Sequence, residues 1–151
     1  NQSPARFLVI ELIGAIVGLI TIVLSGYVAD LVGRRNLLFA TAAVIAVFSG
    51  FAPQLLSGGD AGEVAFMVLG FILLGLSFGQ SSGTLAENFA KVYRYTGSAF
   101  TADLAWLFGA GFAPFVALWL SSHFGLMAAG LYLLSGAVCT LLALGLSRQL
   151  Q

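Results

Sequence analysis

Charged side chains are scarce in this chain of 151 residues, since Asp, Glu, Lys and Arg together make up only 8% of it. A soluble domain usually has about a quarter of its residues charged. Here 60% of the residues are hydrophobic and the mean hydropathy is +1.03. Polar side chains this few cannot cover a surface in water, so the chain must be surrounded mainly by lipid. Its six basic and six acidic residues cancel, which excludes the basic surface typical of nucleic-acid binding.

Cysteine and histidine are nearly absent as well. The one cysteine, Cys139, excludes a disulfide within these residues and a cysteine-rich metal site. The one histidine, His123, argues against a histidine-based metal or haem centre. We therefore expect no metal and no cofactor. A membrane-embedded enzyme is a weak alternative, because the sequence contains no histidine pair, nucleophile motif or ligand cluster.

Long apolar runs make up most of the chain. A helix needs about 20 apolar residues to cross a bilayer, and none of the runs alternates as the strands of a membrane barrel do. Because backbone groups in lipid must pair internally, the sequence predicts an all-α, polytopic membrane bundle. Five spans are expected, at about 7–28, 37–57, 64–86, 96–120 and 124–147.

The positions of the basic residues predict the orientation, because Lys and Arg are retained on the cytoplasmic side. One side of the membrane receives only Arg6, and the other receives Arg34, Arg35, Lys91, Arg94 and Arg148. The N-terminus is therefore expected outside and the C-terminus in the cytoplasm. No basic segment precedes the first run, so no signal peptide is expected. An odd number of spans and a start at Asn1 favour a piece, residues 1–151, of a longer protein.

Polar residues recur on three of the spans. In the third, Ser77, Gln80, Ser81 and Thr84 lie at i, i+3, i+4 and i+7, which places them on one helical face. The first span carries a stripe of small and polar residues that includes Glu11 near the outer end. The second and fifth spans carry no charge and are expected to lie against lipid. The polar faces line an interior cavity or, alternatively, pack against other helices.

Asp103 is the most unusual residue of the fourth span. It lies roughly 9–10 Å inward from Gly97 by helical rise. A charge at that depth costs about 2.5–3.5 kcal/mol if it faces lipid, so Asp103 is expected to face the interior. It is a candidate for accepting and releasing a proton, or it is satisfied by a neighbouring helix. Pro114 removes a backbone donor and is expected to kink the same helix.

A cluster of charge and glycine separates the first two spans. This signature loop, "GYVADLVGRRNLL", runs from Gly26 to Leu38. Gly26 would let another helix approach closely, and Asp30 would lie near the positive end of a helix. Gly33 would allow the left-handed turn that reverses the chain. Arg34 and Arg35 would hold the loop inside and pair with carboxylates.

The signature loop resembles that of the major facilitator superfamily, Gly-x-x-Ala-Asp-x-x-Gly-Arg-Arg/Lys, with departures at Leu31 and Asn36. The third link, "AENFAKVYRYTG", resembles an element of the metabolite:proton symporters in that superfamily, with Ala90 in place of the usual Pro. "FGAGFAP", residues 108–114, resembles a further segment of that branch. Asp103, five residues before it, stands where members of that branch usually carry Gln or Asn. The resemblance implies helices eight to twelve of a twelve-helix transporter, most of one six-helix half.

This resemblance also implies roles for the residues above. Each inside link has an acid followed four residues later by a base, Asp30 before Arg34 and Glu87 before Lys91. The resemblance implies that these residues, with Arg35 and Arg94, form salt bridges between helices on the cytoplasmic face that hold the inside closed. The substrate and proton pathway would include Asp103, Gln80, Ser77, Ser81, Thr84 and Glu11.

The expected function is therefore proton-coupled symport of a small polar metabolite, an organic acid or a betaine-like compound. The expected partners are the bilayer, the missing N-terminal half, the substrate and a proton, and the expected location is a bacterial inner membrane. The alternatives are a membrane scaffold subunit that does not transport, and a facilitator or drug exporter of the same superfamily.

Overall fold

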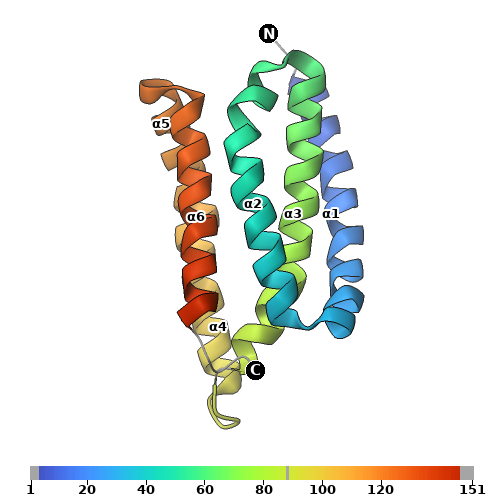
Figure 1. Cartoon of the computed structure of the whole chain (residues 1–151), viewed down its shortest axis with the longest axis vertical. Helices are drawn as coiled ribbons and strands as arrows, with labels where there is room; N and C mark the ends of the chain where they lie inside the picture. The colour runs from blue at the N-terminus through green and yellow to red at the C-terminus, as the bar shows by residue number, and fades with distance from the viewer. Residues whose placement is uncertain (1–3, 88, 147–151) are drawn as a thin grey trace.

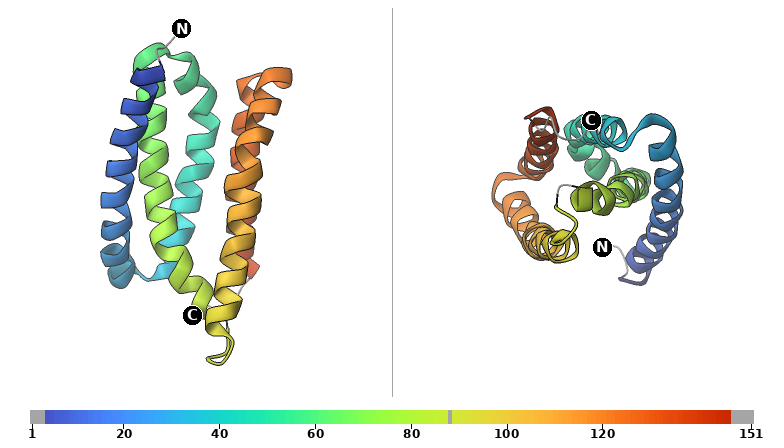
Figure 2. Two further views of the ribbon diagram at one scale, coloured as in Figure 1. Left: turned by 180° about the vertical axis from the view of Figure 1, so that it is seen from behind. Right: turned by 90° about the horizontal axis from the view of Figure 1, so that it is seen from below.

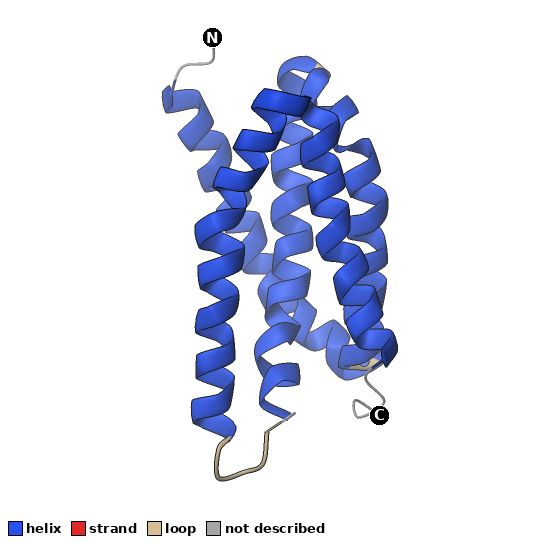
Figure 3. Cartoon of the chain, turned by 90° about the vertical axis from the view of Figure 1, so that its left-hand side faces the viewer, coloured by secondary structure: helices blue, strands red, loops and turns tan. Residues whose placement is uncertain are grey.

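The computed structural model describes residues 4–87 and 89–146, without the side chains of residues 4, 82, 84, 87 and 110. These residues form helices joined by short turns, and no strand occurs among them (Figure 3). The helices are α1 (Pro4–Val32), α2 (Arg34–Ser57), α3 (Gly59–Glu87), α4 (Arg94–Ala105), the π-helical segment η1 (Trp106–Phe112), α5 (Ala113–Phe124) and α6 (Leu126–Leu146).

Five of the described helical stretches are long and apolar enough to cross a membrane. They contain 28, 24, 23, 31 and 21 residues, each above the minimum of about 17. The fourth is the continuous rod α4–η1–α5, which spans Arg94–Phe124. The predicted all-α bundle of five spanning helices is confirmed. Residue 147, the last of the expected fifth span, lies outside the described residues.

Helix α3 lies at the centre of the bundle. It packs against α1, α2 and α4, while α6 packs against α2 and α5. Seen end-on, α1 and α4–η1–α5 flank α3, and α2 and α6 lie together along one side (Figure 2). The first turns of α1 and the last turns of α6 lie at opposite ends of the bundle (Figure 1), as an odd number of spans requires.

Glycines allow α1 and α3 to pack closely. Gly14 and Gly18 have no side chain, and this leaves room for the ring of Phe71. A Cβ added at Gly75 would lie 2.6 Å from the backbone oxygen of Gly18. A Cβ added at Gly79 would lie 2.9 Å from the backbone oxygen of Ile22. Small residues at membrane helix interfaces allow this approach, which favours dispersion contacts where no hydrophobic effect drives association.

Helix α2 has one small-residue face and one bulky face. Thr41, Ala42, Ser49 and Ala52 are buried, and α2 contacts α1, α3 and α6. Its other face exposes large apolar side chains, Phe39, Val44, Val47 and Phe51. The second span was expected to lie against lipid, and this apolar face is the part of α2 suited to that contact.

Candidate functional site: the signature loop and the groove beside α3

The signature loop contains an abrupt reversal between two helices. Gly33 alone separates α1 from α2, with a φ of 87° and a ψ of 138°. Its N–H donates to the oxygen of Ala29 at 2.9 Å, and its own oxygen accepts from the N–H of Leu37 at 3.0 Å. The positive φ explains the need for glycine, although this ψ lies outside the left-handed helical region.

Arg34 reaches across the bundle end to α3. Its guanidinium lies against Gly83, where an added Cβ would be 3.0 Å from the Arg34 Cζ. Gly83 therefore makes room for this side chain. Glu87 follows one turn later on α3, but its side chain lies outside the described residues, so the sequence prediction of its partner stays a prediction.

Arg35 connects the signature loop to the end of α6. Its Nη2 donates to the backbone oxygen of Leu144 at 2.8 Å, and its side chain is half-buried. The last carbonyls of a helix have no partner within the helix, and a cation is favoured there. Carboxylate partners were predicted for the arginines, but the partner that the structure gives Arg35 is a carbonyl.

Replacing Arg35 by glutamine should lower the free energy of unfolding by about 1–2 kcal/mol, because the end of α6 loses a cation. The measurement is unfolding of the purified protein in micelles by added SDS. Arg94→Gln is the matched control: Arg94 is exposed at the start of α4, where a helix does not favour a cation. Equal losses in the two variants would contradict this role for Arg35.

The signature loop has both buried and exposed residues, since Ala29 and Leu37 are buried and Asp30 is not. The carboxyl group of Asp30 is exposed and forms no hydrogen bond or ion pair with the described residues. A Cβ added at Gly26 would meet no atom within 4 Å. Within this chain the close helix approach predicted at Gly26 is therefore not made, and the α1–α3 glycines provide it instead. Lys91 in the turn before α4 and Arg94 at the start of α4 are both exposed.

Gln80 is the most buried of the predicted pathway residues whose side chains are described, with 2% of its surface exposed. Its Nε2 donates to both the backbone oxygen and the Oγ of Ser25, each at 2.7 Å. Ser25 is itself fully buried in α1. Gln80 therefore joins α3 to α1. Of the two alternatives given for the polar faces, a cavity lining or helix packing, Gln80 takes part in helix packing.

The remaining polar residues of α3 are shared among other neighbours. Ser77 is half-buried in a hollow lined by residues of α2, α3 and α6, such as Ile45 and Leu133. Ser81 lines a different hollow, between α3 and α4, and donates to the Phe78 oxygen at 2.9 Å. The side chain of Thr84 lies outside the described residues. The polar residues of this one face of α3 thus have three different surroundings: Gln80 packs on α1, Ser77 lies in the hollow beside α2 and α6, and Ser81 lies in the hollow beside α4.

The candidates on the other helices are not brought against Gln80. Asp103 is exposed on α4, and its carboxyl group forms no hydrogen bond or ion pair with the described residues. Its neighbours Thr101, Ala102 and Ala105 line the hollow beside α3, but Asp103 does not. Glu11 is exposed on α1.

A π-helical segment interrupts the fourth span. It covers Trp106–Phe112, directly before α5, whose first turn contains Pro114. A π-helix has i→i+5 hydrogen bonds and is often found at functional sites. Pro114 cannot donate a backbone hydrogen bond, so the regular pattern must change near it. The sequence predicted a disturbance at Pro114, but not this longer change of helical register.

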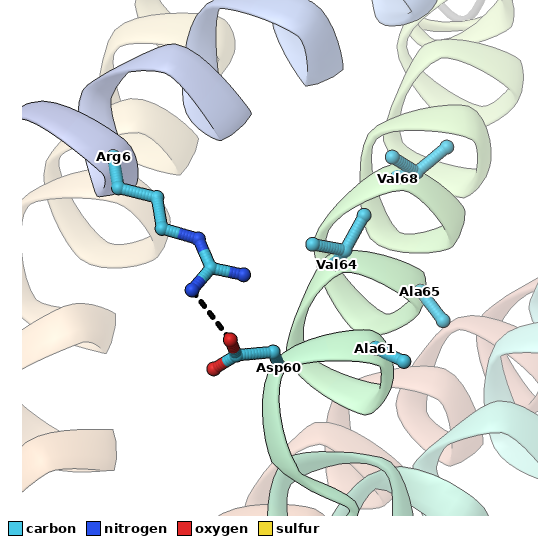
Figure 4. A pocket seen from close by; sticks show the side chains of 6 residues that line it. All are labelled: Arg6, Asp60, Ala61, Val64, Ala65 and Val68. Carbon is cyan, nitrogen blue, oxygen red and sulfur yellow. Dashed lines mark hydrogen bonds and ion pairs between the residues drawn. The ribbon is translucent and has the colours of Figure 1, made fainter.

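The opposite end of the bundle contains an ion pair that the sequence did not predict. Nη1 of Arg6 on α1 donates to Oδ2 of Asp60 in the first turn of α3 at 2.5 Å (Figure 4). Asp60 is suited to the positive N-terminal end of a helix. Both side chains are about half exposed, at 45% and 62%, so the pair contributes only about 0.2–1 kcal/mol.

Two hollows meet along α3 and form what we call the aromatic groove. The hollow on the α4 side has a volume of about 500 Å³ and is lined by residues such as Ser81, Thr101 and Gly109. The hollow on the α1 side is lined by residues such as Gly18 and Ile22. Leu74, Phe78 and Trp106 line both. The Phe78 and Trp106 ring centroids are 5.8 Å apart, with planes inclined at 67°.

Three curated proteins share clear sequence similarity with this chain. The inner membrane metabolite transport protein YhjE of Escherichia coli is 39% identical over 138 residues, which are 89% of this chain and 31% of that protein. Two Haemophilus influenzae proteins named as metabolite transport proteins are 37% and 36% identical, over 91% and 94% of this chain and 32% of each relative. The chain thus spans about a third of the length of these relatives. No protein-family model and no solved structure matches it.

These relatives are transport proteins and not enzymes by name, and the most similar of the three is an inner membrane protein. The described residues supply five helices able to cross a membrane. The chain is therefore an integral membrane homologue of metabolite transport proteins.

Proposed function

We propose that this chain forms helices eight to twelve of a secondary transporter of the major facilitator superfamily. The transporter would carry a small polar metabolite together with a proton by alternating access. The observation that carries this proposal is the similarity to metabolite transport proteins over about nine tenths of the chain. The motif resemblance to metabolite:proton symporters supports the same conclusion.

The arrangement of the helices supports a role as one wall of a transport pathway. In this class of transporter two bundles move against each other around a site near the middle of the membrane. Helices α1, α3 and α4 share the aromatic groove, and Ser81 and Thr101 lie in it. The relatives are about three times as long as this chain, so the proposed opposite wall is supplied by the remainder of such a protein.

The signature loop would lie on the cytoplasmic side and control closure there. Arg35 is held by α6 and Arg34 lies against α3, so the loop is anchored within its own bundle. Asp30, Lys91 and Arg94 are exposed and remain available for contacts beyond this chain. Exposed pairs contribute little, about 0.2–1 kcal/mol each. Weak pairs suit a gate, because two conformations that interconvert must differ by only a few kcal/mol.

Asp103 would carry the proton. It is exposed within the described bundle, so its carboxyl group is not committed to an internal ion pair. A carboxylate inside a membrane requires water, a partner or a proton. The remainder of the transporter would supply a wet crevice in which Asp103 alternates between its charged and neutral forms.

The test is uptake by proteoliposomes that contain the complete gene product. An inward proton gradient should drive accumulation of a small polar metabolite, and collapse of the gradient by a protonophore should abolish it. Uptake that equilibrates without accumulation would favour a facilitator. Lack of transport of any organic acid, betaine, sugar or cationic drug, by a protein that assembles normally, would favour the scaffold alternative.

A further inference from the structure

The segment η1 contains one extra residue within a continuous helix. Ala105 before it has a φ of −63° and a ψ of −38°, and Ala113 after it has a φ of −58° and a ψ of −40°, so the helix is of the α type on both sides. Hydrogen bonds in a π turn join residues five apart, whereas those in an α turn join residues four apart. Asp103 therefore lies where a regular α-helix extended back from α5 would have residue 104.

Pro114 explains why the π turn forms. In a regular α-helix the backbone oxygen of Ala110 would accept from the N–H of residue 114, which proline lacks, and the proline ring would clash with that oxygen. A π turn offers the same oxygen the N–H of Phe115. The alternative form is a regular α-helix with a proline kink, which membrane helices accommodate.

Loss of the π turn would move every residue of α4 by one position. With α5 held in place, each residue would move into the place of the residue before it, by a rotation of about 100° and a rise of about 1.5 Å. Asp103 would then take the place of Ala102. Ala102 and Ser81 line the hollow between α3 and α4, whereas Asp103 does not. This change of register would therefore bring the Asp103 carboxyl group into the hollow.

The hollow can accept the Asp103 side chain. Its volume is about 500 Å³. Ser81 donates its own proton to the Phe78 oxygen at 2.9 Å, so its Oγ remains an acceptor. A neutral carboxyl group has an O–H to donate to such an acceptor, whereas a carboxylate has none. The neutral form therefore suits the hollow, and the charged form suits the exposed face on which Asp103 lies in the structure.

Other charges of this chain lie far from Asp103 along the helices. Helix α4 packs against α3 and η1. The acids of α3 are near its two ends, at Asp60, Glu63 and Glu87, and η1 contains no titratable residue. Arg94 begins α4, roughly 13–14 Å from Asp103 by helical rise. Within this chain, the charge of Asp103 itself is thus the main electrostatic difference between the two registers.

We propose that η1 is a register switch that moves Asp103 between the exposed face of α4 and the hollow beside α3. The π form holds the carboxyl group outside the hollow, and the α form holds it inside, beside Ser81. Protonation of Asp103 favours the α form, and loss of the proton favours the π form. The use of this switch in proton coupling rests on the proposed function, but the change of register does not.

The experiment measures cross-linking between α3 and α4 and needs no transport. The complete gene product carries Ser81→Cys and one further cysteine on α4, in a background without other cysteines, including Cys139→Ser. A short bifunctional maleimide that crosses membranes joins two thiols that face the same hollow. Helix register shifts take about microseconds to milliseconds, so a reaction of several minutes samples both forms.

The position of the cysteine on α4 distinguishes the two forms. Ala102→Cys should cross-link in both, because its place in the α form is that of Thr101, which also lines the hollow. Asp103→Cys should cross-link only in the α form. Leu104→Cys is the matched control, since it lines the hollow in neither form, and it should react at least about tenfold more slowly than Ala102→Cys.

Two changes in η1 and α5 shift the register in opposite directions. Pro114→Ala restores the missing N–H, so cross-linking at position 103 should become at least about tenfold faster. Deletion of Gly111 in the same Pro114→Ala protein removes the extra residue, and a regular α-helix then holds Asp103 where the π form holds it. Cross-linking at position 103 should be lost, while cross-linking at position 102 should persist and show that the protein is folded.

The effect of the charge is measured at position 105. Ala105 lines the hollow in the π form and would leave it in the α form. In a protein with Ser81→Cys and Ala105→Cys, replacing Asp103 by asparagine removes the charge and should slow cross-linking by at least about twofold. An unchanged rate would refute the control of the register by protonation.

Two further results would overturn the switch. Cross-linking at position 103 as slow as at position 104, in both the unaltered and the Pro114→Ala protein, would show that Asp103 does not enter the hollow. Cross-linking at position 103 that survives deletion of Gly111 would show that it does not depend on the helical register. Proton-driven uptake by the same preparation separates these failures from failure of the proposed function, because a transporter without the switch would still accumulate substrate.

Discussion

Proteoliposomes that contain the complete transporter with Asp103→Asn should take up substrate only until its concentrations inside and outside are equal. The unaltered protein should accumulate substrate about tenfold for each unit of pH difference, if one proton accompanies each substrate molecule and the membrane potential is held at zero. Asparagine has a similar shape but cannot release a proton, so the gradient no longer drives uptake. Exchange of labelled for unlabelled substrate needs no net proton movement and should continue.

Asp60→Asn is the control for this prediction. Asp60 pairs with Arg6 at the end of the bundle away from the signature loop, and its side chain is 62% exposed. Its loss should leave accumulation close to that of the unaltered protein. Tenfold accumulation by the Asp103→Asn protein would contradict the proton-carrying role of Asp103.

Replacing Gly75 by leucine should separate α1 from α3 and lower the free energy of unfolding by about 3 kcal/mol, at the upper end of overpacking effects. The position has no room, because an added Cβ would lie 2.6 Å from the Gly18 oxygen and 3.0 Å from the Thr21 Cβ. The backbone of α1 would have to move, and Ser25 would then move away from Gln80. The measurement is SDS-induced unfolding in micelles, with proteolysis of α1 as a second readout.

Gly70→Leu tests whether this loss comes from the interface or from glycine replacement itself. Gly70 lies on the same helix, and an added Cβ there would meet no atom within 4 Å. Leucine has a higher helix propensity than glycine by up to about 1 kcal/mol, so this variant should be unchanged or more stable. Similar losses at the two positions would refute the close α1–α3 packing as the cause.

Hydropathy was enough to predict the five helices, because a helix pairs its backbone groups internally in lipid and none of the apolar runs alternates as barrel strands do. The role of Gly33 in reversing the chain was also predictable. The structure has a φ of 87° at this residue, a value that glycine adopts readily and other residues rarely do. The direction of Gln80 was not predictable. Periodicity places a residue on a face, but it does not say which helix lies opposite, and α3 has three neighbours.

Other contacts depend on residues far apart in the sequence. Arg35 and Leu144 are 109 positions apart, so no local pattern links the signature loop to the end of α6. The Arg6–Asp60 pair joins residues 54 positions apart in the same way. The π-helical segment η1 covers seven residues, Trp106–Phe112, whereas the sequence indicated a disturbance only at Pro114.

The most direct test of a water-filled pathway beside α3 is the rate at which a charged, membrane-impermeant maleimide labels a single cysteine at position 81. The complete transporter would carry Ser81→Cys in a background without other cysteines, including Cys139→Ser. The reference is Val47→Cys on the exposed apolar face of α2. A thiol in water forms the reactive thiolate and a thiol in lipid does not, so labelling should be at least about tenfold faster at position 81 than at position 47. Equal rates at the two positions would contradict the pathway.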